Sequence, residues 1–264
     1  MLPQFINSKY YKYWYILMYS FKQSNLALSK FLIFRIATVL QFCLTIYVWL
    51  LFKDDSNLVT YLFIGYIIRT LAVSSPTNYV ASGIFSGSIT NKLLVPTNYT
   101  LFLFIKEIGA RLISNSVSAL IVLTLLPFFF GKIILPSLTF LFLFPVILTV
   151  GFLVDFFFRY SVALSTFWLK DTIDYILDLI STLTNVLTGL YIPFQFLPSP
   201  LREILPFNPY AWMNYHPMQI YLGNYNSTQI LLTLVGGLFW IIVLYFISQI
   251  VFKLGLKKYE SEGL

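Results

Sequence analysis

Apolar stretches about as long as membrane-spanning helices alternate with short polar breaks along most of the chain. A helix needs about 20 residues to cross a hydrocarbon layer about 30 Å thick, because it rises about 1.5 Å per residue. Six stretches reach this length, over residues 31–52, 58–75, 112–130, 133–154, 172–192 and 229–252. We therefore expect an all-α integral membrane protein in which residues 1–264 form one transmembrane domain, with a six-span bundle at 31–252.

The fifth stretch carries Asp174 and Asp178, so hydropathy alone ranks it lowest. Basic residues decide the count, because cytoplasmic loops hold more Lys and Arg than outer loops. With six spans, the inner side holds Lys9, Lys12, Lys22, Lys30, Arg35, Lys92, Lys106, Arg111, Arg159, Lys170, Lys253, Lys257 and Lys258, and the outer side holds Lys53, Lys132 and Arg202. Without the fifth span the C-terminal lysines would lie outside. We expect both termini, including the tail at 253–264, to be cytoplasmic.

Two segments outside the spans have unusual compositions. Residues 9–29 are too polar to span but rich in Tyr and Trp, whose rings favour the headgroup level of a bilayer. We expect residues 1–30 to form an interfacial helix on the cytoplasmic face; the alternative is a disordered basic tail. Six of the 12 prolines lie within 192–225. Because proline interrupts helices, this stretch predicts short re-entrant helices on the outer side between spans five and six, or else a simple capping loop.

Composition excludes several classes of protein. The chain is 58% hydrophobic and 10% charged, against about 25% charged in soluble domains. The net charge of +7 is scattered rather than gathered in a patch, which argues against nucleic-acid binding. Cys43 is the single cysteine, so an internal disulfide is impossible. The richness in Phe, Ile, Lys, Asn and Tyr is typical of an AT-rich bacterium, and we expect a multi-pass protein of its inner (cytoplasmic) membrane.

Residue patterns for catalysis are missing from the sequence. His216 is the single histidine, and neither HExxH nor the phosphate-binding pattern GxxxxGK[ST] occurs. We therefore expect no catalytic residue, no metal site and no cofactor held by this chain. Any use of ATP must come from a partner. A membrane enzyme of lipid metabolism is disfavoured for the same reason.

Polar residues inside the predicted spans are the strongest candidates for function. A stripe on one face of span five comprises Asp171, Asp174, Asp178, Thr182, Asn185 and Gly189. Such a stripe either lines a water-filled path or protomer interface, or packs against a neighbouring helix. Arg69 lies well inside span two and needs a partner, for which Asp174 or Asp178 is a candidate. Glu107 with Arg111, and Asp155 with Arg159, have the spacing of structural ion pairs within a helix.

In its whole arrangement the chain resembles the permease family of type 2 ABC exporters (the ABC-2 type transporter permease family). The likeness covers the interfacial helix, the six spans and the Pro-rich outer segment. Two strings resemble the family most closely, SGIFSGSITNKLLVP at 82–96 and TGLYIPFQFLP at 188–198. The resemblance implies a complex of this permease with a second, identical or homologous permease and two ABC ATPase subunits, which bind ATP and Mg. The alternative is a non-transporting membrane scaffold or assembly factor.

The resemblance also implies roles for particular residues. The inner loop 82–96 would couple to the ATPase through Ser82, Gly83, Phe85, Ser86, Gly87, Ile89, Asn91 and Lys92. The substrate path or dimer interface would contain Gln41, Thr45, Arg69, Asp174, Asp178, Thr182, Asn185 and Thr188. An outer gate would include Tyr191, Pro193, Phe194 and Phe196.

Overall fold

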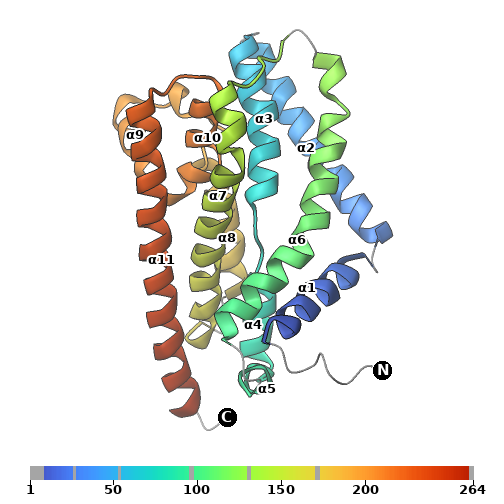
Figure 1. Ribbon diagram of the computed structural model, residues 1–264, viewed down its shortest axis with the longest axis vertical. Coiled ribbons are helices and arrows are strands. Elements are labelled where there is room, and N and C mark those ends of the chain that lie inside the picture. The colour runs from blue at the N-terminus through green and yellow to red at the C-terminus, as the bar shows by residue number, and fades with distance from the viewer. Residues whose placement is uncertain are drawn as a thin grey trace.

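The structure is a computed structural model that describes residues 9–25, 28–52, 55–94, 98–129, 132–169 and 173–261. Within these residues every regular element is a helix (Figure 1). The α-helices are α1 (Lys9–Asn25), α2 (Leu28–Phe52), α3 (Ser56–Ala72), α4 (Thr77–Phe85), α5 (Ile89–Leu93), α6 (Tyr99–Leu123), α7 (Leu138–Leu164), α8 (Ile173–Leu187), α9 (Ser199–Ile204), α10 (Tyr215–Tyr221) and α11 (Ser227–Ser261). The 3-10 helices are η1 (Leu126–Phe129), η2 (Ser165–Phe167), η3 (Phe194–Phe196), η4 (Leu205–Phe207) and η5 (Pro209–Met213).

Three stretches of the described chain are long and apolar enough to cross a membrane: Ser56–Phe85, Leu138–Phe167 and Ser227–Tyr259. They correspond to α3 with α4, to α7 with η2, and to α11. A shorter apolar stretch, Val39–Phe52, lies in α2. The predicted all-α membrane fold is thereby confirmed.

Several helix boundaries differ from the predicted spans. The third predicted span starts at residue 112, but α6 begins at Tyr99, where the Asn98 side chain accepts a hydrogen bond from the N–H of Leu101. The fourth starts at residue 133 and ends at 154, but α7 runs from Leu138 to Leu164. The fifth reaches residue 192, but α8 ends at Leu187. Hydropathy falls at the charged residues of α6 and α7, whereas the backbone hydrogen bonds of these helices continue past them. α8 instead ends just before Gly189, whose φ of 73° is not helical.

The helical nature of residues 9–25 is confirmed, and α1 packs across α6 (Figure 1). Its exposed face carries four aromatic side chains, Tyr11, Trp14, Tyr15 and Tyr19. The opposite face meets α6 at Gly109, where the two backbones come unusually close. A Cβ atom on Gly109 would lie 2.5 Å from the carbonyl oxygen of Leu17.

Replacing Gly109 by Val is therefore expected to separate α1 from α6. Overpacking of this kind costs about 1–3 kcal/mol, and here the obstacle is backbone, which cannot rotate away. The measurement is the rate of trypsin cleavage after Lys12 and Lys22, which should rise in Gly109→Val. Ser116→Val, which adds volume at an exposed position of α6, is the control. Equal cleavage rates in both variants would contradict this account of the contact.

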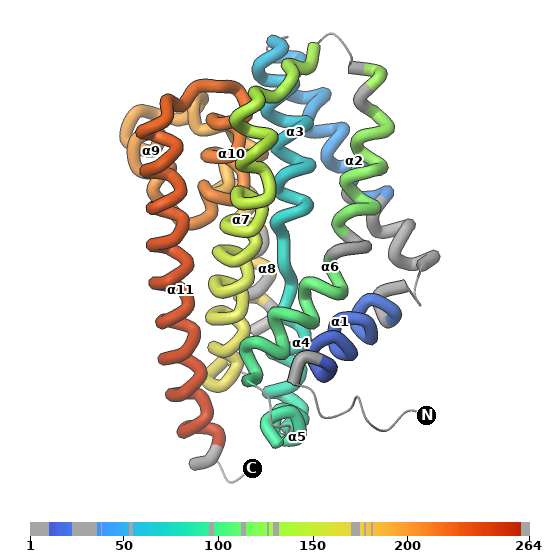
Figure 2. The backbone as a smooth tube through the Cα atoms, in the orientation of Figure 1, coloured from blue at the N-terminus to red at the C-terminus, as the bar shows by residue number. Residues whose placement is uncertain are grey.

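Residues 188–226, which we call the cap segment, fold into the short elements η3, α9, η4, η5 and α10. They gather at the end of the molecule opposite α4 and α5 (Figures 1 and 2). His216 holds two parts of the segment together, because its ring nitrogens lie 2.9 Å from the Tyr225 hydroxyl and 2.8 Å from the Pro206 carbonyl oxygen. The expected short broken helices are thus present.

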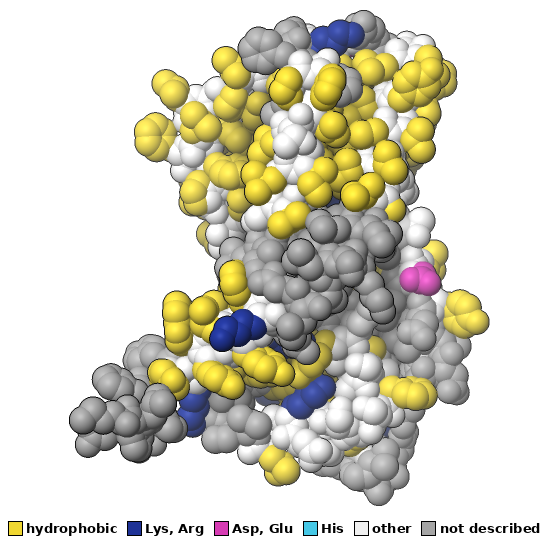
Figure 3. Space-filling model, turned by 90° about the vertical axis from the view of Figure 1, so that its right-hand side faces the viewer, with side chains coloured by type: hydrophobic (Ala, Val, Ile, Leu, Met, Phe, Trp, Pro, Cys, Tyr) yellow, Lys and Arg dark blue, Asp and Glu magenta, His cyan; other side chains and the backbone are white. Residues whose placement is uncertain are grey.

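Hydrophobic side chains are distributed unevenly over the surface. Figure 3 shows one face on which they gather in the upper part of the view, while Lys and Arg lie at the top edge and in the lower part. α11 shows the same exposure of apolar groups, because many of its Leu, Ile and Phe side chains are exposed. An apolar zone between two polar ends matches the hydrocarbon layer of a bilayer.

Candidate functional site

The central helix α3 is interrupted inside the bundle. It ends at Ala72, residues 73–76 are non-helical, and α4 starts at Thr77 (Figure 2). We call residues 73–76 the helix break. Backbone N–H and C=O groups without a helical partner are costly at membrane depth, so they need side chains to satisfy them.

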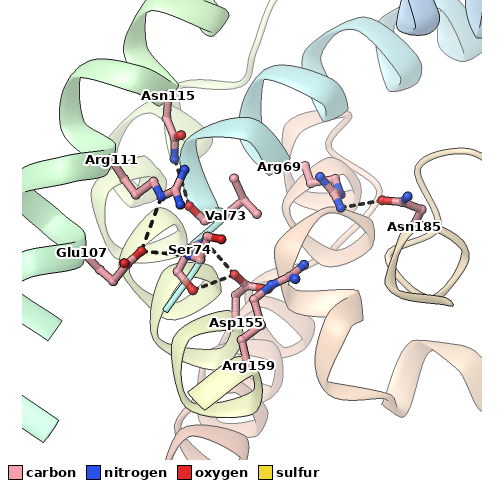
Figure 4. Close-up of polar contacts among 10 residues, drawn as sticks. Arg69, Val73, Ser74, Glu107, Arg111, Asn115, Asp155, Arg159 and Asn185 are labelled. Atoms are coloured by element: carbon pink, nitrogen blue, oxygen red, sulfur yellow. Dashed lines mark hydrogen bonds and ion pairs between the residues drawn. The ribbon is translucent and has the colours of Figure 1, made fainter. Parts of the chain in front are cut away.

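Three side chains from α6 and α7 supply those hydrogen bonds, and we call Glu107, Asn115 and Asp155 the clamp (Figure 4). Asp155 accepts from the Ser74 N–H at 2.6 Å and from the Ser74 hydroxyl at 2.8 Å. Glu107 accepts from the Ser75 N–H at 2.9 Å. The Asn115 amide donates to the Val73 carbonyl oxygen at 2.9 Å. The break is therefore held by residues distant in sequence.

Both clamp carboxylates are also paired with an arginine one turn further along their own helix. Arg159 Nε lies 2.8 Å from Asp155 Oδ1, and Arg111 Nε lies 3.4 Å from Glu107 Oε2. The two ion pairs predicted from the spacing are confirmed. The sequence analysis did not predict that these carboxylates also bind the helix break. The Ser-Ser-Pro at 74–76 is the sequence signal for the break, because a residue before proline disfavours helical geometry.

Arg69 points from α3 toward α8, where one Nη donates to Asn185 Oδ1 at 2.6 Å (Figure 4). An ion pair of Arg69 with Asp178 was one sequence-based possibility, but Asp178 is exposed and the structure shows no such pair. The side chain of Asp174 lies outside the described residues. Two turns of helix, about 10 Å, separate Asn185 from Asp178, so one arginine meets only one of them.

The remaining predicted path residues lie on the surfaces of α2 and α8. Gln41, Asp178 and Thr182 are exposed, and Thr45 is half-buried with its hydroxyl on the Gln41 carbonyl oxygen at 3.1 Å. Thr188 differs, because it is fully buried. The stripe of α8 therefore divides into an inward part and an outward part, and its role as a path stays a prediction.

We call α4, the following turn and α5 the elbow (residues 77–94), and it contains the described part of the predicted coupling loop. Residues 95 and 96 of that loop lie outside the described residues. Ser82, Phe85, Ser86 and Asn91 are exposed, Lys92 and Gly87 are half-buried, and Gly83 and Ile89 are buried. The turn depends on Gly87, whose φ of 77° disfavours other residues. Leu94, which was not among the predicted residues, is 82% exposed at the tip of the elbow.

A buried cluster holds the elbow against the ends of α7 and α11. Ile84 and Ile89 of the elbow pack with Phe167 and Tyr259. Tyr79 adds a second connection, because Lys106 Nζ and Lys92 Nζ lie 3.1 and 3.9 Å from the centre of its ring. Burial lowers the pKa of Lys92 and, more strongly, that of Lys106, to about 8. The elbow is a fixed surface rather than a free loop.

The predicted outer-gate residues connect the cap segment to α2. Trp49 of α2 donates through Nε1 to the Tyr191 carbonyl oxygen at 2.9 Å, and its ring stacks on Phe196 at 4.9 Å. Pro193 and Phe194 are buried, whereas Phe196 is 41% exposed. Tyr191 and Phe196 thus contact α2, whereas Phe194 packs in a separate cluster with Trp212 and Tyr215. The function of these residues as a gate stays a prediction.

The described residues place several ionisable side chains inside a helical membrane bundle, where such groups are rare and most often functional. Residues 53–263 match the family model of the ABC-2 family transporter protein. The chain therefore belongs to the ABC-2 transporter family, as the sequence resemblance implied. The matched region starts just after α2, so α1 and α2 lie outside it. No curated protein matches the chain.

Proposed function

We propose that this chain is the permease subunit of an ATP-driven exporter in which the ATPase is a separate polypeptide. Membership of the ABC-2 family supports a permease. The sequence carries no phosphate-binding loop pattern, so ATP and Mg would bind to two partner ATPase subunits. The elbow is the observation that carries the proposal, because it combines a rigid base with an exposed apolar tip.

Helix directions support six spans with a cytoplasmic elbow. α3 starts at the cap end while α1 lies near the elbow, so α2 crosses between them (Figure 1). α7 and α11 also start at the cap end. α6, which leads from the elbow to α7, and α8, which leads from the end of α7 to the cap segment, therefore cross as well. With Lys92 of α5 and Lys257 of α11 at the elbow end, the positive-inside rule assigns that end to the bacterial cytoplasm. The cap segment then forms re-entrant helices on the outer side.

The elbow is suited to receive a movement and pass it on. Phe85 is 66% exposed and Leu94 is 82% exposed, and together they present the apolar surface that interface cores favour. α4 leads directly from this surface to the helix break. Displacement of α4 would therefore act on the clamp and, beyond it, on the arrangement of α3, α6 and α7.

The substrate path would lie between two permeases that meet through α2 and α8. Both helices expose apolar side chains, such as Leu44 and Leu179, beside the polar Gln41, Asp178 and Thr182. Surfaces of mixed polarity suit a protomer interface with a passage through it. A non-transporting scaffold remains the competing function, and it would need no contact at the elbow.

The test is copurification of the ATPase with tagged full-length chain from its native host. We expect Phe85→Glu and Leu94→Glu to reduce the amount of copurified ATPase at least about tenfold. A charge in the core of an interface costs about 1.4 kcal/mol or more of binding free energy. Leu201→Glu, at an exposed position of α9, should retain it. An unchanged unfolding temperature shows that the elbow variants are folded. A chain that is folded and active in cells but carries no ATPase would instead establish the scaffold.

A further inference from the structure

Arginines outnumber carboxylates in the polar centre of the bundle. The described residues there include Arg69, Arg111 and Arg159, with Glu107 and Asp155 as the acids (Figure 4). Each acid is already bonded to its own arginine and to the helix break. One positive charge is therefore left over, and it belongs to Arg69.

The hydrogen bonds of Asp155 come from Ser74 and Arg159 rather than from Arg69. One of its oxygens accepts from Arg159 Nε, and the other accepts both hydrogen bonds from Ser74. Arg69 itself donates to the neutral Asn185 amide, and the described part of the chain offers it no carboxylate within ion-pairing distance. A guanidinium in the middle of a membrane domain needs an anion near it, because desolvation of an uncompensated charge costs several kcal/mol.

Two buried donors near this charge also lack acceptors. Arg69 Nε and the Tyr210 hydroxyl are both shielded from solvent and have no hydrogen-bond partner among the described residues. Tyr210 belongs to η5, and its ring packs edge-on against that of Phe158, with 4.8 Å between the ring centroids. This packing fixes the position of the hydroxyl. Tyr210 packs in one cluster with Ala72, which lies one turn after Arg69 in α3. Donors of two elements are thus unsatisfied beside an excess of positive charge.

We propose that Arg69 and Tyr210 form an anion-binding site between α3, α8 and η5 that takes one carboxylate or phosphate group. A guanidinium binds such oxyanions through paired N–H donors, and a phenol hydroxyl adds a third hydrogen bond. Arg159 contributes positive charge without giving up its bond to Asp155. Resting on the proposed function, the site would hold the anionic group of the transported substrate. The Asn185 amide orients the Arg69 side chain.

The test measures binding to the permease alone, so it does not depend on the ATPase. Purified full-length chain in a neutral detergent is titrated with inorganic phosphate against sodium chloride of equal ionic strength. We expect a saturable rise in Tm of about 2–4 °C, the size that moderate ligand binding produces in a chain of this length. Tyr210→Phe, which keeps the ring packing, and Arg69→Met should abolish the rise. Arg202→Met, an exposed cation of α9, should retain it.

A second arm separates two sources of the anionic group. The chain is placed in phosphatidylcholine nanodiscs with and without phosphatidylglycerol. If a lipid headgroup occupies the site, phosphatidylglycerol should raise the Tm of wild type but not that of Tyr210→Phe, and added phosphate should have no further effect. A soluble oxyanion would still act in those nanodiscs. The proposal is overturned if phosphate and phosphatidylglycerol shift wild type and Tyr210→Phe equally, or shift neither. A negative result in this binding test would not affect the proposed function, which is tested separately by copurification of the ATPase with the elbow variants.

Discussion

Replacement of Asp155 by Ala is expected to lower the free energy of unfolding by about 3–5 kcal/mol, the cost of breaking a buried ion pair. Asp155 is fully buried, and its carboxylate accepts from Arg159 and from both donor groups of Ser74. The substitution leaves a buried cation and a backbone N–H without acceptors. Thermal unfolding of the purified chain, followed by tryptophan fluorescence, should show Tm lower by about 10 °C.

Asp178→Ala is the matched control, because Asp178 is an exposed aspartate of α8. Exposed substitutions change stability by about 0.5 kcal/mol or less, so its Tm should stay near that of wild type. Ser74→Ala separates the two contributions, since it removes the hydroxyl donor and keeps the ion pair. A normal Tm for Asp155→Ala would show that the helix break does not depend on the clamp.

The second large effect is expected at Trp212, the residue that fixes the cap segment to α11. Its indole packs against Gly236 and Gly237 and donates through Nε1 to the Thr233 carbonyl oxygen at 2.7 Å. Trp212→Ala should cost about 3–5 kcal/mol, because it opens a cavity and removes the hydrogen bond of the indole to α11. Limited proteolysis should then cut the cap segment first, at a lower temperature than in wild type.

Two further variants define this contact. Trp168→Ala is the control, since Trp168 is 41% exposed and its loss creates no buried cavity. Gly237→Leu should reproduce much of the Trp212→Ala effect, because a Cβ there would lie 2.9 Å from the indole ring. The double variant should lose less unfolding free energy than the sum of the two single losses, because both substitutions remove the same contact. Additive effects would place the two residues in separate contacts.

Much of the fold follows from the sequence because its main driving force is local. Apolar runs of sufficient length located α3, α7 and α11, and Tyr and Trp located α1. Boundaries were wrong where polar groups are satisfied inside the helix, as in α6 and α7. The helix break was predicted only as the end of a span. Its partners come from α6 and α7, and no periodicity within one segment encodes such distant contacts.

The candidate site was harder to predict for a geometric reason. Helical spacing placed Asp178 and Asn185 on one face, but a shared face does not imply a shared partner, and only Asn185 reaches Arg69. The family resemblance located the elbow, yet the exposure of Leu94 and the burial of Ile89 depend on how α5 packs against α11. Tyr210 had no distinguishing signal in the sequence, because its unpaired hydroxyl exists only in the folded chain.

α11 has 35 residues, about 52 Å at 1.5 Å per residue, which well exceeds a hydrocarbon layer of about 30 Å. It contains no proline, the usual cause of a sharp kink. One end carries the Trp212 contact, and at the other Tyr259 packs beside the elbow. A continuous helix held at both ends would tilt as one body. Any tilt that moves the elbow one way would thus swing the cap segment the other way, so the two ends of the bundle would change together.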